Sequence, residues 1–172
     1  MILGCPASGK TTLARRLAAE LSLPVLSKDD VKEGLFDTLG TGDRRHSRQL
    51  SDASFAILVR VARAQLEAGL SCLLEGNWRP EHADRVQAAA DAADARIAQV
   101  WCSARPQELE RRFLARHRHP GHLDEAVSGI DVQRAGRQPP SFLNLTGPRW
   151  TYDSERPARY AELVGEVKPW RV

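Results

Sequence analysis

The sequence has few of the features that mark secreted or membrane proteins. Its cysteines number 3, at Cys5, Cys72 and Cys102, and their spacing matches neither a disulfide framework nor a metal site. It has no long apolar run of transmembrane length and no signal-peptide pattern. Internal repeats and low-complexity tracts are also missing. These absences predict a cytoplasmic protein with reduced thiols and no membrane partner.

An excess of charge of one sign is nearly missing too. Lys and Arg number 25 against 22 Asp and Glu, a formal net charge of +3. That excess is too small for a tail that coats nucleic acid, and it suits an enzyme that handles phosphates. With 42% apolar residues, the 172-residue chain is long enough for one substantial core, so we expect a single domain over residues 1–172.

A glycine-rich pattern follows the first apolar residues. Positions 4–11 read Gly-Cys-Pro-Ala-Ser-Gly-Lys-Thr, which fits G-x-x-x-x-G-K-[ST]. In such a loop the glycines let backbone N–H groups converge on phosphate oxygens, Lys10 reaches the β- and γ-phosphates, and Thr11 offers a hydroxyl to Mg²⁺. An amphipathic segment, 12–21, places this loop at a helix N-terminus. The predicted nucleotide-binding residues are Gly4, Cys5, Pro6, Ala7, Ser8, Gly9, Lys10, Thr11 and Thr12.

Short apolar runs and helical patterns alternate along the rest of the chain. Strands are expected within 23–27, 70–74, 96–102 and 141–145, and helices within 51–68, 81–94, 106–118, 124–137 and 158–167, with another helix after residue 28. This alternation predicts an α/β fold whose parallel sheet is covered by helices on both faces.

Carboxylates follow two of the expected strands. Asp29 and Asp30 come after the 23–27 strand, and Glu75 comes after the 70–74 strand. Ligands of parallel α/β sheets gather beyond the carboxyl ends of the strands, so Gly4, Asp29 and Glu75 are expected to converge. A carboxylate there can accept a hydroxyl proton or hold Mg²⁺ through water. The alternative is that Ser27 or Asp29 only caps the next helix, with Asp29 and Asp30 favourable to its dipole.

Arginines are dense in the 106–118 segment. Helical spacing would place Arg112 and Arg116 on one face, where planar guanidinium groups can stabilise a transferred phosphoryl group. The alternative is an ordinary solvated charged face. His117, His119 and His122 surround Pro120-Gly121, which favours a turn at the tip of a lid over a zinc site.

Four motifs in order resemble the small P-loop kinases, a group that includes the kinase domain of polynucleotide kinase, chloramphenicol phosphotransferase and zeta-toxin-like enzymes. They are the 4–11 loop, Ser-Lys-Asp-Asp at 27–30, Glu-Gly-Asn at 75–77, and the Arg-rich 112–122 segment. The resemblance implies a P-loop NTPase fold with a five-stranded parallel sheet and a mobile basic lid over about 105–123. It also implies an ATP-dependent, Mg²⁺-requiring transfer of the γ-phosphoryl group to a hydroxyl of a small molecule or a nucleic-acid 5′ end.

The resemblance assigns roles residue by residue. Asp29 matches the carboxylate that takes the acceptor proton, and Lys32 stands where polynucleotide kinase has an arginine near the acceptor. Arg112 and Arg116 align with arginines of the lid helix, while Ala7 replaces a frequent glycine. The predicted catalytic residues are Lys10, Asp29, Lys32 and Arg116; Arg112 and Arg116 join the nucleotide site; the Mg²⁺ candidates are Thr11, Asp29 through water, and Glu75.

Two other functions are consistent with the same residues. A nucleotide-binding switch or simple NTPase would hydrolyse or bind nucleotide without any dependence on an acceptor. A nucleic-acid-binding protein would use Arg44, Arg45, Arg48 and the lid arginines as a phosphate track, and its affinity would fall steeply with salt. The sequence does not identify the acceptor, because the shape of the binding pocket determines which hydroxyl compound binds.

Overall fold

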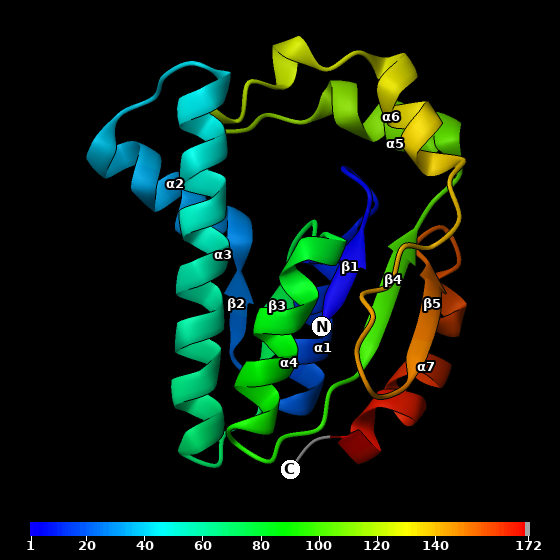
Figure 1. The fold of residues 1–172 in the computed structure, drawn as a ribbon. Helices are drawn as coiled ribbons and strands as arrows, with labels where there is room; N and C mark the ends of the chain where they lie inside the picture. Colours follow the sequence, from blue (N-terminus) through cyan, green and yellow to red (C-terminus); the bar gives the residue numbers. More distant parts are fainter. Residues whose placement is uncertain (171–172) are drawn as a thin grey trace.

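A five-stranded parallel sheet forms the centre of the protein in a computed structural model that describes residues 1–170 (Figure 1). Residues 171 and 172, which end the 1–172 range expected to form one domain, lie outside the described residues. The strand order is β2-β3-β1-β4-β5. The strands are β1 (Ile2–Gly4), β2 (Val25–Ser27), β3 (Leu73–Glu75), β4 (Gln99–Ser103) and β5 (Arg149–Asp153). The predicted sheet is therefore confirmed, with the strand bearing the phosphate loop at its middle.

Helices cover both faces of the sheet because neighbouring residues of a strand point to opposite sides. Leu3 and Leu74 pack with helices α3 (Arg44–Glu67) and α4 (Ala83–Asp91), whereas Ile2 and Leu73 pack with helices α1 (Lys10–Leu21) and α7 (Tyr160–Val167). Figure 1 shows these two layers, and the remaining helices lie near the carboxyl ends of the strands. They are α2 (Lys28–Leu39), α5 (Pro106–Ala115) and α6 (Gly129–Gly136).

The expected strand at 141–145 is wrong, and the fifth strand is Arg149–Asp153. Leu143 and Leu145 are buried in the core, but their segment is irregular. The buried Gln99 side chain explains how this segment is tolerated: its amide accepts from the Leu143 N–H at 2.8 Å and donates to the Leu143 carbonyl at 3.1 Å. A side chain thus satisfies backbone groups that a strand partner would otherwise satisfy.

Several helices differ from their expected bounds. Helix α4 is shorter than 81–94, and α6 begins at Gly129 rather than near residue 124. Helix α3 begins at Arg44 rather than near residue 51, because the Asp43 carboxylate caps it by accepting from the His46 N–H at 2.8 Å. The basic stretch 44–48 is therefore helical. Helix α5 ends at Ala115 rather than near residue 118, and Arg116 has an extended backbone. The chain then forms a 3₁₀ turn at Pro120–His122, which confirms the predicted break there.

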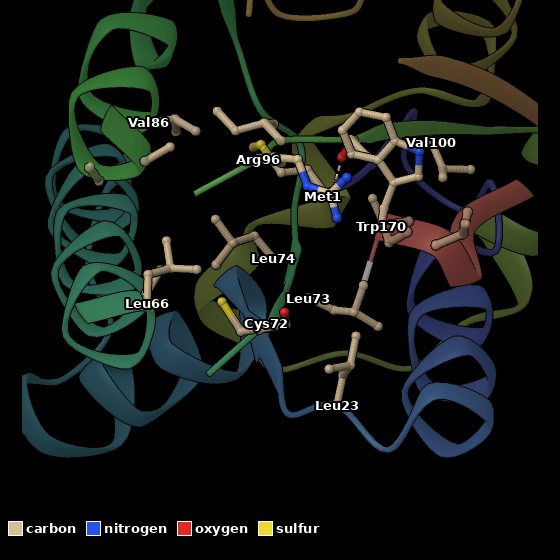
Figure 2. Close-up of a pocket in the computed structure, with 18 of the residues that line it drawn as sticks. Met1, Leu23, Leu66, Cys72, Leu73, Leu74, Val86, Arg96, Val100 and Trp170 are labelled. Carbon is tan, nitrogen blue, oxygen red and sulfur yellow. Dashed lines mark hydrogen bonds between the residues drawn. The ribbon is translucent and has the colours of Figure 1, made fainter. Parts of the chain in front are cut away.

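An apolar cavity lies beside the amino ends of the central strands (Figure 2). Its lining includes Leu23, Leu66, Cys72 and Val86, and among residues 1–170 Arg96 is its one charged side chain. The phosphate loop follows the opposite end of β1, so this cavity is separate from the predicted site. Among residues 1–170, none of the helices combines the length and hydrophobicity that a membrane span requires.

Candidate active site

The phosphate loop joins β1 to α1 and has the backbone that its glycines predict. Gly4 and Gly9 have φ angles of +152° and +92°. A Cβ on Gly4 would lie 2.4 Å from the Cys102 carbonyl oxygen, so the loop can turn this close to β4 only with glycine. Ala7 also has a positive φ, +62°, at the position where the resembling kinases have a frequent glycine.

The loop has polar groups that an anion can satisfy. The Lys10 Nζ donates only to the carbonyl of Cys5, at 3.2 Å, and forms no ion pair within residues 1–170. The Ser8 Oγ is buried and has no hydrogen-bond partner among the described residues. Thr11 lies half-buried in the first turn of α1. A helix N-terminus with an unpaired ammonium group fits nucleotide phosphates, and the Thr11 hydroxyl is a suitable Mg²⁺ ligand.

The sheet register brings the predicted carboxylates to the same edge as the loop. Glu75 lies opposite both Ile2 of β1 and Ser27 of β2. The Glu75 side chain is buried and accepts a hydrogen bond from the Ser27 hydroxyl at 3.0 Å. Burial raises the pKa of Glu75, although the nearby Lys10 charge opposes this effect. Glu75 is therefore placed between the phosphate loop and α2.

Asp29 lies in the first turn of α2 and carries two ion pairs. Its carboxylate accepts from Lys28 Nζ at 3.1 Å and also pairs with the Arg118 guanidinium. Burial alone would raise the pKa of Asp29, but the charges of Lys28 and Arg118 outweigh it and hold that pKa well below its usual range. The stability that ionised Asp29 gives to the folded state is fully present above the pKa of an unfolded aspartate, about 4. It is lost only as pH falls through the lower pKa that Asp29 has in the folded state.

Asp30 differs from its neighbour in exposure and in role. Its side chain is exposed, and its backbone N–H donates to the Ser27 hydroxyl at 3.4 Å. Ser27 is therefore the N-cap of α2, one of the two caps that the sequence left open. Asp29, not Asp30, faces the pocket that contains Lys10.

The two predicted lid arginines approach the loop from different elements. Arg112 of α5 donates to Ser154 at 2.8 Å, and its Nη1 would lie 3.6 Å from a Cβ placed on Gly9. Arg116 follows the helix and pairs with Asp124 at 2.8 Å. The shared helical face that their spacing predicted is therefore wrong, because α5 ends one residue before Arg116. Arg116 nevertheless lines the same pocket as Lys10 and Asp29.

Residues 117–123, which we call the docking segment, lie against α2 and α3 (Figure 1). The His119 ring stacks on Phe36 with a centroid distance of 5.1 Å, and His122 Nε2 is 2.8 Å from Glu33. The Ser47 hydroxyl of α3 donates to the Gly121 carbonyl at 2.9 Å. These contacts make the docking segment one wall of the pocket that contains Asp29.

We predict that Gly121→Ala loosens this wall. The added Cβ would lie 2.6 Å from ring atoms of Phe36, which is 2% exposed and cannot easily move. Overpacking of this kind typically costs about 1–3 kcal/mol, which urea denaturation measures, and hydrogen exchange should rise in the docking segment. Gly34→Ala is the matched control: nothing lies within 4 Å of its Cβ, and it should stabilise α2 by about 0.5–1 kcal/mol. Equal stability of the two variants would contradict the packing of Gly121 on Phe36.

The sequence reasoning missed two charged neighbours of Asp29. Arg118 was expected within a helix, where its contact with Asp29 across 89 residues has no local signal. Lys28 is adjacent to Asp29 in sequence and lies in the same first helical turn. That position could have indicated an ion pair between the two side chains. Its side chain is buried, and burial lowers its pKa despite the attraction of Asp29.

The parallel sheet with a phosphate loop after its central strand, and a basic segment facing that loop, define a P-loop NTPase fold of the small-kinase type. Residues 1–140 match the AAA domain family AAA_33. The chain belongs to this family, whose match spans most of its length.

Solved structures agree with this assignment. A candidate kinase from Chloroflexus aurantiacus is 34% identical, with a TM-score of 0.87, over 99% of this chain and 97% of that one. The APS kinase of Mycobacterium tuberculosis, solved with AMPPNP and APS, superimposes with a TM-score of 0.63 at 21% identity over 97% and 95% of the two chains. At this identity, the likeness to the APS kinase shows a shared fold alone.

A curated relative is considerably longer than this chain. An uncharacterized protein of Mycobacterium tuberculosis is 33% identical over 147 residues, which cover 80% of this chain and 29% of the relative. The chain thus spans less than a third of that protein. Together the family match and the structures identify a kinase-like P-loop domain.

Proposed function

We propose that this protein transfers the γ-phosphoryl group of Mg·ATP to a hydroxyl group of an acceptor. The observation that carries the proposal is that Lys10 of the phosphate loop, the Asp29 carboxylate and Arg116 line one pocket. Phosphoryl transfer needs these three kinds of group: a cation at the phosphates, a carboxylate at the nucleophile and a guanidinium where charge develops. Residues 1–172 would act as one kinase domain.

The proposed reaction is an in-line displacement. The acceptor oxygen forms a bond to the γ-phosphorus while the bond from that phosphorus to the β–γ bridging oxygen breaks, and ADP leaves. The hydroxyl proton passes to Asp29, which its low pKa keeps ionised at neutral pH. A loose transition state needs little early deprotonation, so a weakly basic carboxylate suffices. Lys10, Arg112 and Arg116 stabilise the phosphoryl oxygens, and Lys32 acts on the acceptor side.

Mg²⁺ would be held by the Thr11 hydroxyl, and Asp29 and Glu75 are the candidates to bind its water ligands. When bound, the ion neutralises charge on the β- and γ-phosphate oxygens. Glu75 is the weaker of the two candidates because its carboxylate is buried and already accepts from Ser27.

We propose that the lid over 105–123 consists of two parts. Helix α5 carries Arg112 beside the phosphate loop, and the docking segment lies on α2 and α3. We propose that the first part responds to nucleotide and the second to the acceptor. Hydrogen exchange with AMPPNP alone should therefore protect 106–116 more than 117–123; equal protection of both would contradict the division.

The function is tested by transfer of labelled γ-phosphate from ATP to a panel of hydroxyl compounds: nucleosides, sugars, sugar phosphates, antibiotics and a 5′-hydroxyl oligonucleotide. We expect label in at least one acceptor and little release of inorganic phosphate without it. ATP hydrolysis at the same rate with and without every acceptor would favour a simple NTPase or a nucleotide-dependent switch.

A further inference from the structure

One side of the pocket is formed by α2, α3 and the loop after β3, and we call it the acceptor side. It carries more positive charge than the carboxylates of the pocket lining can neutralise. Basic side chains line it from α2, α3 and the loop after β3, whereas the carboxylates in the same lining are Asp29 and Asp124. Both carboxylates are already paired, Asp29 with Lys28 and Arg118, and Asp124 with Arg116 and Arg118. Other basic residues that line this side include Lys32, Arg48 and Arg79, of which Arg79 pairs with Glu81, outside the lining, at 3.4 Å.

Lys32 is the most informative of these residues. It is 5% exposed, and its ammonium group donates to the neutral Ser47 hydroxyl at 2.9 Å. No carboxylate within residues 1–170 forms an ion pair with it, and the Phe36 ring, 5.0 Å from Nζ, supplies only a weak cation–π contact. Burial, followed by the charge of Lys28, lowers the pKa of Lys32 to about 8. A buried cation without a counter-ion is costly, and an anionic ligand would remove that cost.

Lys32 lies next to the proposed reaction centre, so an anion bound to it would lie there too. Lys32 lies three residues after Asp29 on α2, so the two side chains share a helix face. Arg79 and Arg118 line the same pocket as Lys32, and their charges lower its pKa, whereas the charge of Asp29 raises it. Arg48, one turn after Arg44 on α3, is exposed and has no ion-pair partner in the described chain.

We propose that the acceptor is a small hydroxyl compound that also carries a phosphate-like anionic group, and that Lys32, with Arg48 and Arg79, binds this group. The inference rests on the proposed function and identifies the substrate class of that site. The anionic group enters the pocket beside α2, and the hydroxyl faces Asp29. A small compound is favoured over a nucleic-acid strand because Lys28 and Lys32 are only 4% and 5% exposed. A polymer backbone would instead follow exposed side chains.

A structural role for Lys32 makes a different prediction. Through Ser47, Lys32 is linked to the Gly121 carbonyl and so to the docking segment. If Lys32 only supported this wall, Lys32→Met would lower the melting temperature and leave anion binding unchanged. For an anion site the reverse is expected: the melting temperature stays the same or rises, because a buried unpaired charge is removed, and anion binding is lost.

The binding test is calorimetric titration of inorganic phosphate into protein saturated with Mg·AMPPNP, which occupies the phosphate loop. We expect one phosphate site, weakened about 10–100-fold by Lys32→Met, because a hydrogen bond to a charged group is lost. Arg45→Met is the matched control, since Arg45 is an exposed cation on the first turn of α3 that does not line the pocket. Absence of phosphate binding, or equal binding by the Lys32 and Arg45 variants, would overturn the proposal.

Matched acceptors provide the second test and separate this inference from the proposed function. Glycerol is compared with glycerol 3-phosphate, glucose with glucose 6-phosphate, and adenosine with adenosine 3′-phosphate and a 5′-hydroxyl oligonucleotide. We expect transfer to a phosphorylated small compound at least tenfold faster than to its neutral partner, and loss of that preference in Lys32→Met. Faster transfer to neutral compounds, or transfer to the oligonucleotide alone, overturns the anionic-acceptor inference while the kinase stands. Phosphate binding without transfer to any compound contradicts the kinase and leaves the anion site supported by the titration.

Discussion

Asp29→Asn is expected to lower the turnover number for phosphoryl transfer by about 10²–10⁴-fold, the usual contribution of a positioned proton acceptor. The affinity for ATP should stay nearly unchanged, because Asp29 acts on the acceptor and would reach Mg²⁺ only through a water ligand, not through the nucleotide phosphates. The amide keeps the shape of the carboxylate but cannot take the hydroxyl proton. Steady-state kinetics with the identified acceptor and titration with AMPPNP measure the two effects separately.

Asp30→Asn is the control for this variant. Both residues lie in the first turn of α2, so each change removes one negative charge from the same helix N-terminus. Asp30 is exposed and does not line the pocket, so its variant should keep nearly full turnover. Thermal denaturation of both variants is needed because Asp29→Asn also leaves Lys28 and Arg118 without their shared partner. If Asp30→Asn lost turnover while Asp29→Asn kept it, the proton acceptor would be Asp30 and not Asp29.

Lys10→Ala is expected to weaken ATP binding by about 10–100-fold, the equivalent of one charge-assisted hydrogen bond of about 1.5–3 kcal/mol. Turnover should fall as well, since the same ammonium group stabilises the charge that develops on the transferred phosphoryl group. Among residues 1–170, the Lys10 ammonium group forms one hydrogen bond, to the Cys5 carbonyl, and no ion pair, so removing the side chain should leave folding intact.

The chain offers a matched lysine for comparison. Lys168 is exposed in the 3₁₀ turn that follows α7, distant from the phosphate loop (Figure 1). Lys168→Ala changes the net charge by the same amount as Lys10→Ala, so it controls for long-range electrostatics. Calorimetric titration with Mg·AMPPNP should show wild-type affinity for the Lys168 variant. Unchanged nucleotide affinity and turnover in Lys10→Ala would contradict the assignment of the loop.

Errors in predicting the strands and helices came from places where a distant residue supplies what the local pattern lacks. The 141–145 run is apolar because Leu143 and Leu145 fill the core, but the Gln99 side chain, far away in sequence, satisfies its backbone. The true fifth strand, Arg149–Asp153, lies at an edge of the sheet and is only partly buried, so it reads as polar and aromatic residues in alternation.

Determinants within a few residues of one another could be recognised from the sequence alone. They include the glycines and Lys10 of the phosphate loop, the Ser27 cap of α2, and the alternation of strands and helices, all of which the structure contains. Such features depend on backbone conformations and side-chain periodicities that are set locally.

Only the tertiary structure decided which charges meet around Asp29. Arg118 reaches that carboxylate across 89 residues, and Lys32 meets Ser47 while Ser47 holds the Gly121 carbonyl. Neither residue spacing nor composition encodes these contacts, because they depend on how α2, α3 and the docking segment pack together. The same packing buries Lys32 with no ion pair to a carboxylate of residues 1–170, and the proposed anion site rests on this burial and not on the residue type.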